Sequence, residues 1–192
     1  MESDKVTVVN DATRPQTMPR LAGLGQITEH LYLSNGKAAN NSSMVSGFKI
    51  TCIINATENV TNIPIPAVEY VRVPVADSPS SQLGDHFDSV ADKIHRVQEQ
   101  QGRVLVHCSA GVSRSATLCI AYLMKYRSMT LSDAHLWVRS RRPIIRPNSG
   151  FWKQLIDYEN KLYGCGTVRM ITSPVGEIPD VYEKETRNLI PY

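Results

Sequence analysis

The amino-acid sequence predicts an α/β fold: a single domain in which helices flank a central, mostly parallel sheet of about five strands. Short β-branched runs alternate along the chain with stretches of helical period, which is the pattern of strands joined through helices. One run, residues 50–56, is almost continuously apolar, as a strand buried on both faces of a parallel sheet should be. A chain of 192 residues can build one sizeable hydrophobic core and hardly two.

The first half of the chain is expected to contribute most of the strands. Residues 1–20 are polar, contain two prolines and lack periodicity, so they are predicted to form a disordered arm. A loop with two prolines, residues 61–66, separates the central run from an alternating one. Strands are therefore expected at residues 24–27, 31–33, 50–56 and 69–75, with a short helix at 38–45 that ends at Gly47.

The second half is expected to be mainly helical. An apolar stripe of helical period runs through residues 84–100 and stops before Gly102. After a strand at 103–106, further helices are expected at 115–126, from Thr130 to about Arg142, and at 148–163. Trp137 and Trp152 are predicted to lie in the core. The tail, residues 165–192, follows a domain spanning residues 21–164, and it either folds back on that domain or stays mobile.

Composition and charge narrow the class of protein. Apolar residues make up 42% and charged residues 20% of the chain, which is typical of a soluble globular protein. The net charge of +3 does not indicate nucleic-acid binding. No apolar run approaches the roughly 18 residues of a transmembrane helix. The four cysteines lack the spacing of a disulfide framework or metal site, so neither a metal nor a cofactor is expected; they are Cys52, Cys108, Cys119 and Cys165.

The chemistry concentrates in the stretch HCSAGVSRSA, residues 107–116, which joins the expected strand at 103–106 to the helix at 115–126. The backbone N–H groups of such a loop converge, and the helix N-terminus adds partial positive charge, so the loop is suited to bind an anion. The same field favours a thiolate, which makes Cys108 a predicted nucleophile. Arg114 offers a rigid fork for two phosphate oxygens.

The other residues of this stretch are suited to supporting roles. Small side chains let the backbone curl around a phosphate, and Gly111 permits a left-handed conformation or a close approach. Ser115 can donate a hydrogen bond to the sulfur of Cys108 and help the thiolate to leave. The predicted substrate-binding loop is Ser109, Ala110, Gly111, Val112 and Ser113.

This signature, a His-Cys pair followed after five residues by Arg-Ser, resembles that of the cysteine-dependent protein phosphatases. The stretches AGVSRSAT and AYLM are similar to the dual-specificity branch, and the tail resembles a small subgroup of its atypical members. The likeness extends from about Gly25 to Leu162. It implies an α/β catalytic domain with a phosphate-binding loop between strand and helix. It also implies a protein phosphatase that hydrolyses phosphotyrosine and phosphoserine or phosphothreonine through a cysteinyl-phosphate intermediate.

A thiolate that attacks a phosphate ester needs an acid to protonate the departing oxygen and later a base to activate water. Asp77 is predicted to do both, because it follows the strand at 69–75 in a turn-prone stretch. The resemblance also places a general acid at this strand end. Three other aspartates are rivals, but they fall on the helix at 84–100, where a solvated face is the simpler interpretation: Asp85, Asp88 and Asp92.

Several residues near the signature have two interpretations. His107 is predicted to orient the loop or to assist Cys108 through hydrogen bonds, since strand geometry points it away from the thiol. Asn148 matches an asparagine that supports the phosphate loop in the family resembled, and it is also a candidate helix N-cap. A basic cluster either complements a helix C-terminus or docks an acidic or second phosphorylated residue; it comprises Arg139, Arg141, Arg142 and Arg146.

Two functions other than a protein phosphatase are compatible with such a loop: a phosphatase for phosphoinositides or RNA ends, and a phosphate-binding module without turnover. Phosphatases for phosphoinositides or RNA ends tend to carry basic residues inside the loop, whereas its side chains here are neutral. A binding module without turnover would need a damaged catalytic residue, yet all three are present: Cys108, Arg114 and Asp77. Phosphorylated proteins, kinases of signalling cascades among them, are therefore the expected partners, and the oligomeric state stays open.

The predicted nucleophile also has consequences for location and redox behaviour. A reactive thiol needs a reducing compartment, so the protein is expected in the cytoplasm, the nucleus or both. Peroxide should inactivate it, with Cys52 or Cys119 as candidate resolving partners.

Overall fold

A five-stranded mixed sheet forms the centre of the computed structural model, which describes residues 23–187 and 189. The arm expected at residues 1–20 lies outside the described residues. All neighbouring strands are parallel except β1 and β2, which confirms the mostly parallel α/β fold. Across the sheet the strands are β1 (Leu24–Gln26), β2 (Leu31–Ser34), β5 (Val104–His107), β3 (Cys52–Asn55) and β4 (Glu69–Arg72).

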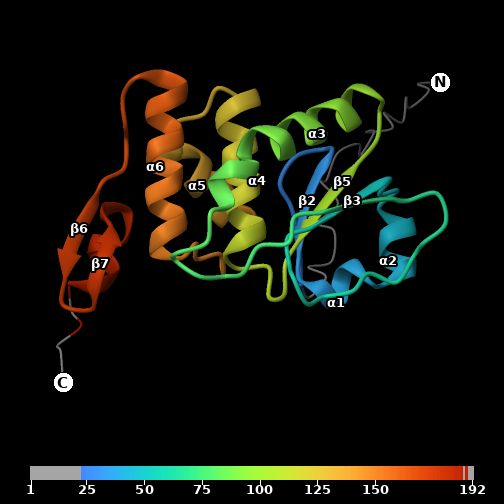
Figure 1. Ribbon diagram of the computed structural model, residues 1–192, viewed down its shortest axis with the longest axis horizontal. Helices are drawn as coiled ribbons and strands as arrows, with labels where there is room; N and C mark the ends of the chain where they lie inside the picture. Colours follow the sequence, from blue (N-terminus) through green and yellow to red (C-terminus); the bar gives the residue numbers. More distant parts are fainter. Residues whose placement is uncertain (1–22, 188, 190–192) are drawn as a thin grey trace, which may run out of the picture.

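Helices cover both faces of this sheet (Figure 1). Four gather on one face: α3 (Phe87–Glu99), α4 (Arg114–Tyr126), α5 (Leu131–Arg141) and α6 (Ser149–Tyr163). On the other side lie α1 (Gly36–Ala39) and α2 (Ser42–Gly47). Alternation along the strands follows this division: Val104 and Val106 belong to the larger core, whereas Leu105 belongs to the smaller one. Both faces of the central strands are therefore buried, as their apolar sequences predict.

Helix ends coincide with the residues that cap them. The side chains of Thr130 and Asn148 accept hydrogen bonds from backbone N–H groups in the first turns of α5 and α6. Gly164 ends α6 with a φ of +70°, the left-handed conformation that favours glycine. α4 is buried on nearly all sides from Arg114 to Met124, so the helix that follows the loop at residues 108–113 is anchored in the core.

The tail folds back on the domain. It contains a hairpin of β6 (Met170–Ser173) and β7 (Gly176–Pro179), a 3₁₀ turn η2 (Asp180–Tyr182) and a short helix α7 (Glu183–Thr186). Val168, Ile178 and Tyr182 join the larger core, and the hairpin lies beside α6 (Figure 1). Of the two expected arrangements, the packed one is therefore observed through residue 187.

Some local expectations are corrected. The helix expected at 38–45 is two short helices, α1 and α2, because Asn41 caps a second start. The helix expected at 84–100 begins with a 3₁₀ turn, η1 (Leu83–His86). Trp152 is fully buried, but Trp137 is 39% exposed and donates through Nε1 to the carbonyl of Ile27, so the core prediction for Trp137 was wrong. No helix in the described part of the chain is long and apolar enough to span a membrane.

Candidate active site

The predicted nucleophile lies at the carboxyl end of β5, where the chain turns into α4. Cys108 is 2% exposed, and its Sγ lies 3.0 Å from the Oγ of Ser115 in the first turn of α4. A hydroxyl at this distance can donate to a thiolate. Parallel sheets bind ligands at this end of their strands, and α4 directs the positive end of its dipole toward the loop.

The backbone of the loop has its N–H groups free for a ligand. Within residues 23–187 and 189, no N–H of residues 109–113 donates to another protein group. Its carbonyls are bonded on the outer side: the Arg142 side chain donates to Gly111 O and Ala110 O at 2.8 and 3.0 Å, and Arg146 N donates to Val112 O at 2.8 Å. Holding the carbonyls outward leaves five successive N–H groups available for an anion.

Gly111 is required by the shape of this loop. Its φ is +67°, and an added Cβ would lie 2.6 Å from Ser34 O and 2.9 Å from Nη2 of Arg142. A larger residue would therefore be strained and would also displace the arginine that supports the loop.

Arg114 is held by two hydrogen bonds and has one buried donor left over. Its Nη1 donates to Val75 O and its Nη2 to the Oγ of Ser109, each at 3.0 Å. Its Nε is buried and has no hydrogen-bond partner among the described residues. An unpaired buried guanidinium donor is costly, and a phosphate oxygen bound in the loop would satisfy it.

His107 faces away from the thiol, as its place on the strand predicts. Its Nδ1 lies 3.2 Å from Cys108 O and its Nε2 lies 2.9 Å from the side-chain nitrogen of Asn62. Burial lowers the pKa of His107, so the neutral ring is favoured. A neutral ring that accepts from Asn62 has its proton on Nδ1, where it donates to the backbone at Cys108. No signal in the sequence identifies Asn62.

Asp77 lies in the connection between β4 and η1, residues 73–82, which we call the acid segment. The side chain is exposed, and its Oδ1 accepts a hydrogen bond from Nδ2 of Asn148 at 2.9 Å. Asn148 also caps α6 through its Oδ1 and donates from its backbone N–H to the Oγ of Ser113. The N-cap interpretation of Asn148 is therefore confirmed. Its contact with the loop comes from the backbone, so a supporting role of the side chain for the loop stays a prediction, and the bond to Asp77 is an additional contact.

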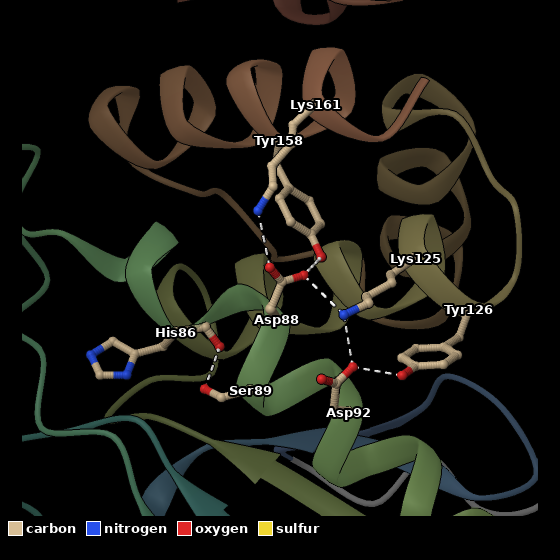
Figure 2. Close-up of polar contacts among 8 residues, drawn as sticks. All are labelled: His86, Asp88, Ser89, Asp92, Lys125, Tyr126, Tyr158 and Lys161. Atoms are coloured by element: carbon tan, nitrogen blue, oxygen red, sulfur yellow. Dashed lines mark hydrogen bonds and ion pairs between the residues drawn. The ribbon is translucent and has the colours of Figure 1, made fainter. Parts of the chain in front are cut away.

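Two of the rival aspartates are engaged away from this loop (Figure 2). Asp88 accepts from Lys125, Tyr158 and Lys161, and these hydrogen bonds, that from Lys125 foremost, hold its pKa well below the usual range. Asp92 pairs with Lys125 and accepts from Tyr126. The two carboxylates therefore join α3 to α4 and α6, instead of forming a plain solvated face.

The basic cluster is divided among different contacts. Arg142 supports the loop, and Arg141 stacks over the ring of Trp137 at 4.3 Å. Arg139 and Arg146 both pair with Glu185 of the tail, at 2.6 and 3.5 Å. Arg139 and Arg141 do lie in the last turn of α5, as the helix-terminal interpretation predicts, and docking stays a prediction. Neither interpretation includes the contacts with the loop carbonyls or with Glu185, because these partners are distant in the sequence and not visible in a local pattern.

Comparisons with known proteins show the family to which the chain belongs. Residues 31–161 match the family model described as dual specificity phosphatase, catalytic domain. Dual specificity protein phosphatase 18 from Homo sapiens is 60% identical over 173 residues, covering 90% of this chain and 92% of that protein. Dual specificity protein phosphatase 14 from Homo sapiens is 53% identical over 189 residues, covering 94% and 96%.

Among solved structures, a mouse putative dual specificity phosphatase complexed with zinc tungstate superposes with a TM-score of 0.73. It is 32% identical, and the match covers 79% of this chain and 96% of that one. Human DUSP28 superposes with a TM-score of 0.72 at 33% identity, covering 75% of this chain and 97% of that one. Sequence, fold and relatives lead to one conclusion: the chain belongs to the dual specificity protein phosphatases.

Proposed function

We propose that this phosphatase acts on phosphotyrosine and on phosphoserine or phosphothreonine, with Cys108 as the nucleophile of a cysteinyl-phosphate intermediate. One observation carries the assignment: the thiol lies beside a loop with five unpaired N–H groups and an unpaired Nε of Arg114, within the described residues. These donors are suited to the oxygens of a phosphate monoester dianion. They would bring its phosphorus close to Sγ.

The first step transfers the phosphoryl group to sulfur. The thiolate of Cys108 forms the S–P bond while the P–O bond to the leaving group breaks. Asp77 gives its proton to the departing oxygen, so a neutral tyrosine, serine or threonine side chain leaves. Loop N–H groups and Arg114 stabilise the charge on the equatorial oxygens during the transfer.

The second step returns the enzyme to its starting state. The carboxylate of Asp77 takes a proton from water as the water oxygen attacks phosphorus, and the S–P bond breaks. The hydroxyl of Ser115, 3.0 Å from Sγ, donates to the thiolate that departs. Inorganic phosphate leaves with the added oxygen, and Asp77 is again protonated.

The chemistry of the loop favours protein substrates. Its side chains between Cys108 and Arg114 are neutral, so they add no cation for the extra phosphates of a phosphoinositide. We extend the proposal to phosphorylated proteins of signalling cascades, including kinases, and to the cytoplasm and nucleus as reducing compartments in which a nucleophilic thiol persists. Phosphosite profiling with an Asp77→Ala, Cys108→Ser trap, together with imaging of the tagged protein, would test both extensions.

The central test uses Cys108→Ser with a ³²P-labelled phosphopeptide. The wild type should show protein that carries covalent label after rapid denaturation, and the variant should show none while it still binds orthovanadate. A serine hydroxyl stays protonated at neutral pH and is a poor nucleophile. Arg114→Lys should also lose turnover, because a point charge cannot replace a bidentate fork. Hydrolysis by pure Cys108→Ser above a few per cent of wild type would refute the covalent route.

A further inference from the structure

The acid segment has little regular structure of its own. Its internal backbone hydrogen bonds are Val75 N to Val73 O and Ser81 N to Ser78 O. Val73, Val75 and, just beyond the segment, Leu83 are buried, which fixes the two ends of the connection. Asp77 lies between those ends and is exposed, so the position of its backbone depends on contacts with other elements.

α6 supplies contacts to the main chain of this segment. Nε2 of Gln154 donates to Ser81 O at 2.8 Å, and its Oε1 accepts from Gly84 N at 2.7 Å. One turn earlier on the same face of α6, Gly150 lies against the backbone of Pro79. These contacts fall at Pro79 and Ser81 in the acid segment and at Gly84 in η1, just beyond it. All of them lie on the chain after Asp77.

Position 150 requires glycine because the backbone of Pro79 leaves no room for a side chain. Glycine is a poor helix former, and the φ of Gly150 is not in the left-handed range, so backbone conformation does not require it. An added Cβ would overlap Pro79 O and would lie 2.5 Å from the carbonyl carbon and Cα of Pro79. Since those atoms are backbone, any other residue would push the segment away from the helix.

We propose that Gly150 and Gln154 are positioning residues for the general acid: they seat the main chain of the acid segment on α6 before substrate arrives. The proposal rests on Asp77 as the acid. Asn148 orients only the carboxyl group of Asp77, whereas Gly150 and Gln154 determine where its backbone lies. A displacement of about 1 Å can cost roughly 100-fold in rate when it misplaces a reacting group.

The experiment compares two substrates whose leaving groups differ in their need for a proton. A phosphothreonine peptide releases an alkoxide, while 4-nitrophenyl phosphate releases a stable phenoxide. The comparison uses kcat/KM, which reports the first transfer, because the hydrolysis of the cysteinyl-phosphate also needs Asp77 and is common to both substrates. Gly150→Ala should lower kcat/KM on the peptide about 10- to 100-fold and lower kcat/KM on the aryl phosphate much less. Gln154→Met, which keeps size but loses both hydrogen bonds, should show the same selectivity. The matched control is Gly47→Ala, since a Cβ there meets nothing within 4 Å.

A double-mutant cycle with Asp77→Asn separates positioning from general damage. If Gly150 acts through Asp77, Gly150→Ala adds no further loss on the peptide in the Asp77→Asn background. The inhibition constant of orthovanadate should stay unchanged in Gly150→Ala, because the phosphate-binding loop is untouched.

Equal losses on both substrates, or an additive loss in the double variant, would overturn the positioning role while leaving Asp77 as the acid. If Asp77→Asn itself shows no dependence on the leaving group, the acid assignment and the positioning proposal fail together. The single Asp77→Asn measurement distinguishes these two failures.

Discussion

At the scale of single residues, Arg142 has a larger structural role than its place in a basic cluster indicates. It is 6% exposed, and burial lowers its pKa. Its donors bond two carbonyls of the phosphate-binding loop. Because these bonds engage the carbonyls, Arg142 determines which face of the loop backbone is left open for the phosphate that we propose it binds.

We expect Arg142→Lys to weaken phosphate binding. An ammonium cannot span both carbonyls, and losing one hydrogen bond from a charged donor costs about 1.5–3 kcal/mol. The inhibition constant for orthovanadate and the KM should therefore rise by roughly tenfold or more, without a change in the dependence on leaving group. Arg141→Lys, at the neighbouring exposed position, is the control and should leave both constants near wild type.

Ser115 should govern the second chemical step. Removing the hydroxyl that lies 3.0 Å from Sγ should slow thiolate departure about 10- to 100-fold, as expected for one hydrogen bond to a charged group. Stopped-flow assays of Ser115→Ala with 4-nitrophenyl phosphate should then show a burst of one phenol per enzyme before a slow steady state. Ser89→Ala on α3 should show no new burst, and a burst-free Ser115→Ala would contradict the role.

At the scale of elements, the strand register and α4 decide between the two candidate resolving cysteines. Cys52 pairs in register with Val104, four positions before Cys108 along the neighbouring strand. At about 3.3 Å per residue this separates them by roughly 13 Å, whereas a disulfide needs Cα atoms within about 7 Å. Cys119 lies one turn after Ser115 on α4, so the strand register does not separate it from Cys108 in this way; burial, and secondarily the charge of Cys108, raises the pKa of its thiol.

Peroxide should therefore inactivate the enzyme, and an internal disulfide should join Cys108 to Cys119. Peptide mapping after mild oxidation measures the pairing directly. Cys119→Ser should lose the disulfide and regain less activity on addition of a thiol reductant, whereas Cys52→Ser should behave like wild type. Detection of a Cys52–Cys108 disulfide, or of no disulfide at all, would contradict this assignment.

At the scale of the whole molecule, the tail and the domain meet around a buried histidine. His135 on α5 is 4% exposed and packs edge-on against Trp152 of α6 and Tyr182 of η2. Burial first, then the charges of Arg139 and Arg146, lower its pKa to about 4, while Glu185 opposes the shift. The folded protein therefore favours neutral His135, whereas the unfolded chain takes up a proton near pH 6.5.

Stability should consequently fall as the pH decreases from about 6.5 to about 4, by an amount on the order of 3 kcal/mol. In this window the unfolded state binds more protons, so acid favours unfolding, and the stabilisation is complete above the unfolded pKa. Thermal unfolding at several pH values should show a shallower acid decline for His135→Phe, which keeps an aromatic ring in place. The surface variant His86→Gln is the control; an unchanged decline in His135→Phe would exclude the histidine as its source.

The sequence by itself determined the fold class, most element positions and the catalytic signature. These features are local: strand and helix periods repeat within a few residues, caps such as Thr130 act on the next turn, and Cys108, Arg114 and Ser115 lie within one short loop. Asp77 was predicted as the general acid from the turn-prone stretch after the strand expected at 69–75; β4 ends earlier, at Arg72, and the sequence could not place the carboxyl group of Asp77.

Only the tertiary structure decided which residues contact that loop and Asp77, the proposed general acid. Arg142 reaches carbonyls 31 and 32 residues away, Asn148 bonds to Asp77 across 71 residues, and Gln154 bonds to Ser81 across 73. The packing of α5 and α6 beside the sheet brings these partners together. The hydrophobic pattern of the sequence predicts the helices, but it is compatible with many different polar pairings between them. Trp137 and Gly150 are also explained only by tertiary contacts. The exposure of the Trp137 indole and the need for glycine at position 150 depend on neighbours that folding places beside them.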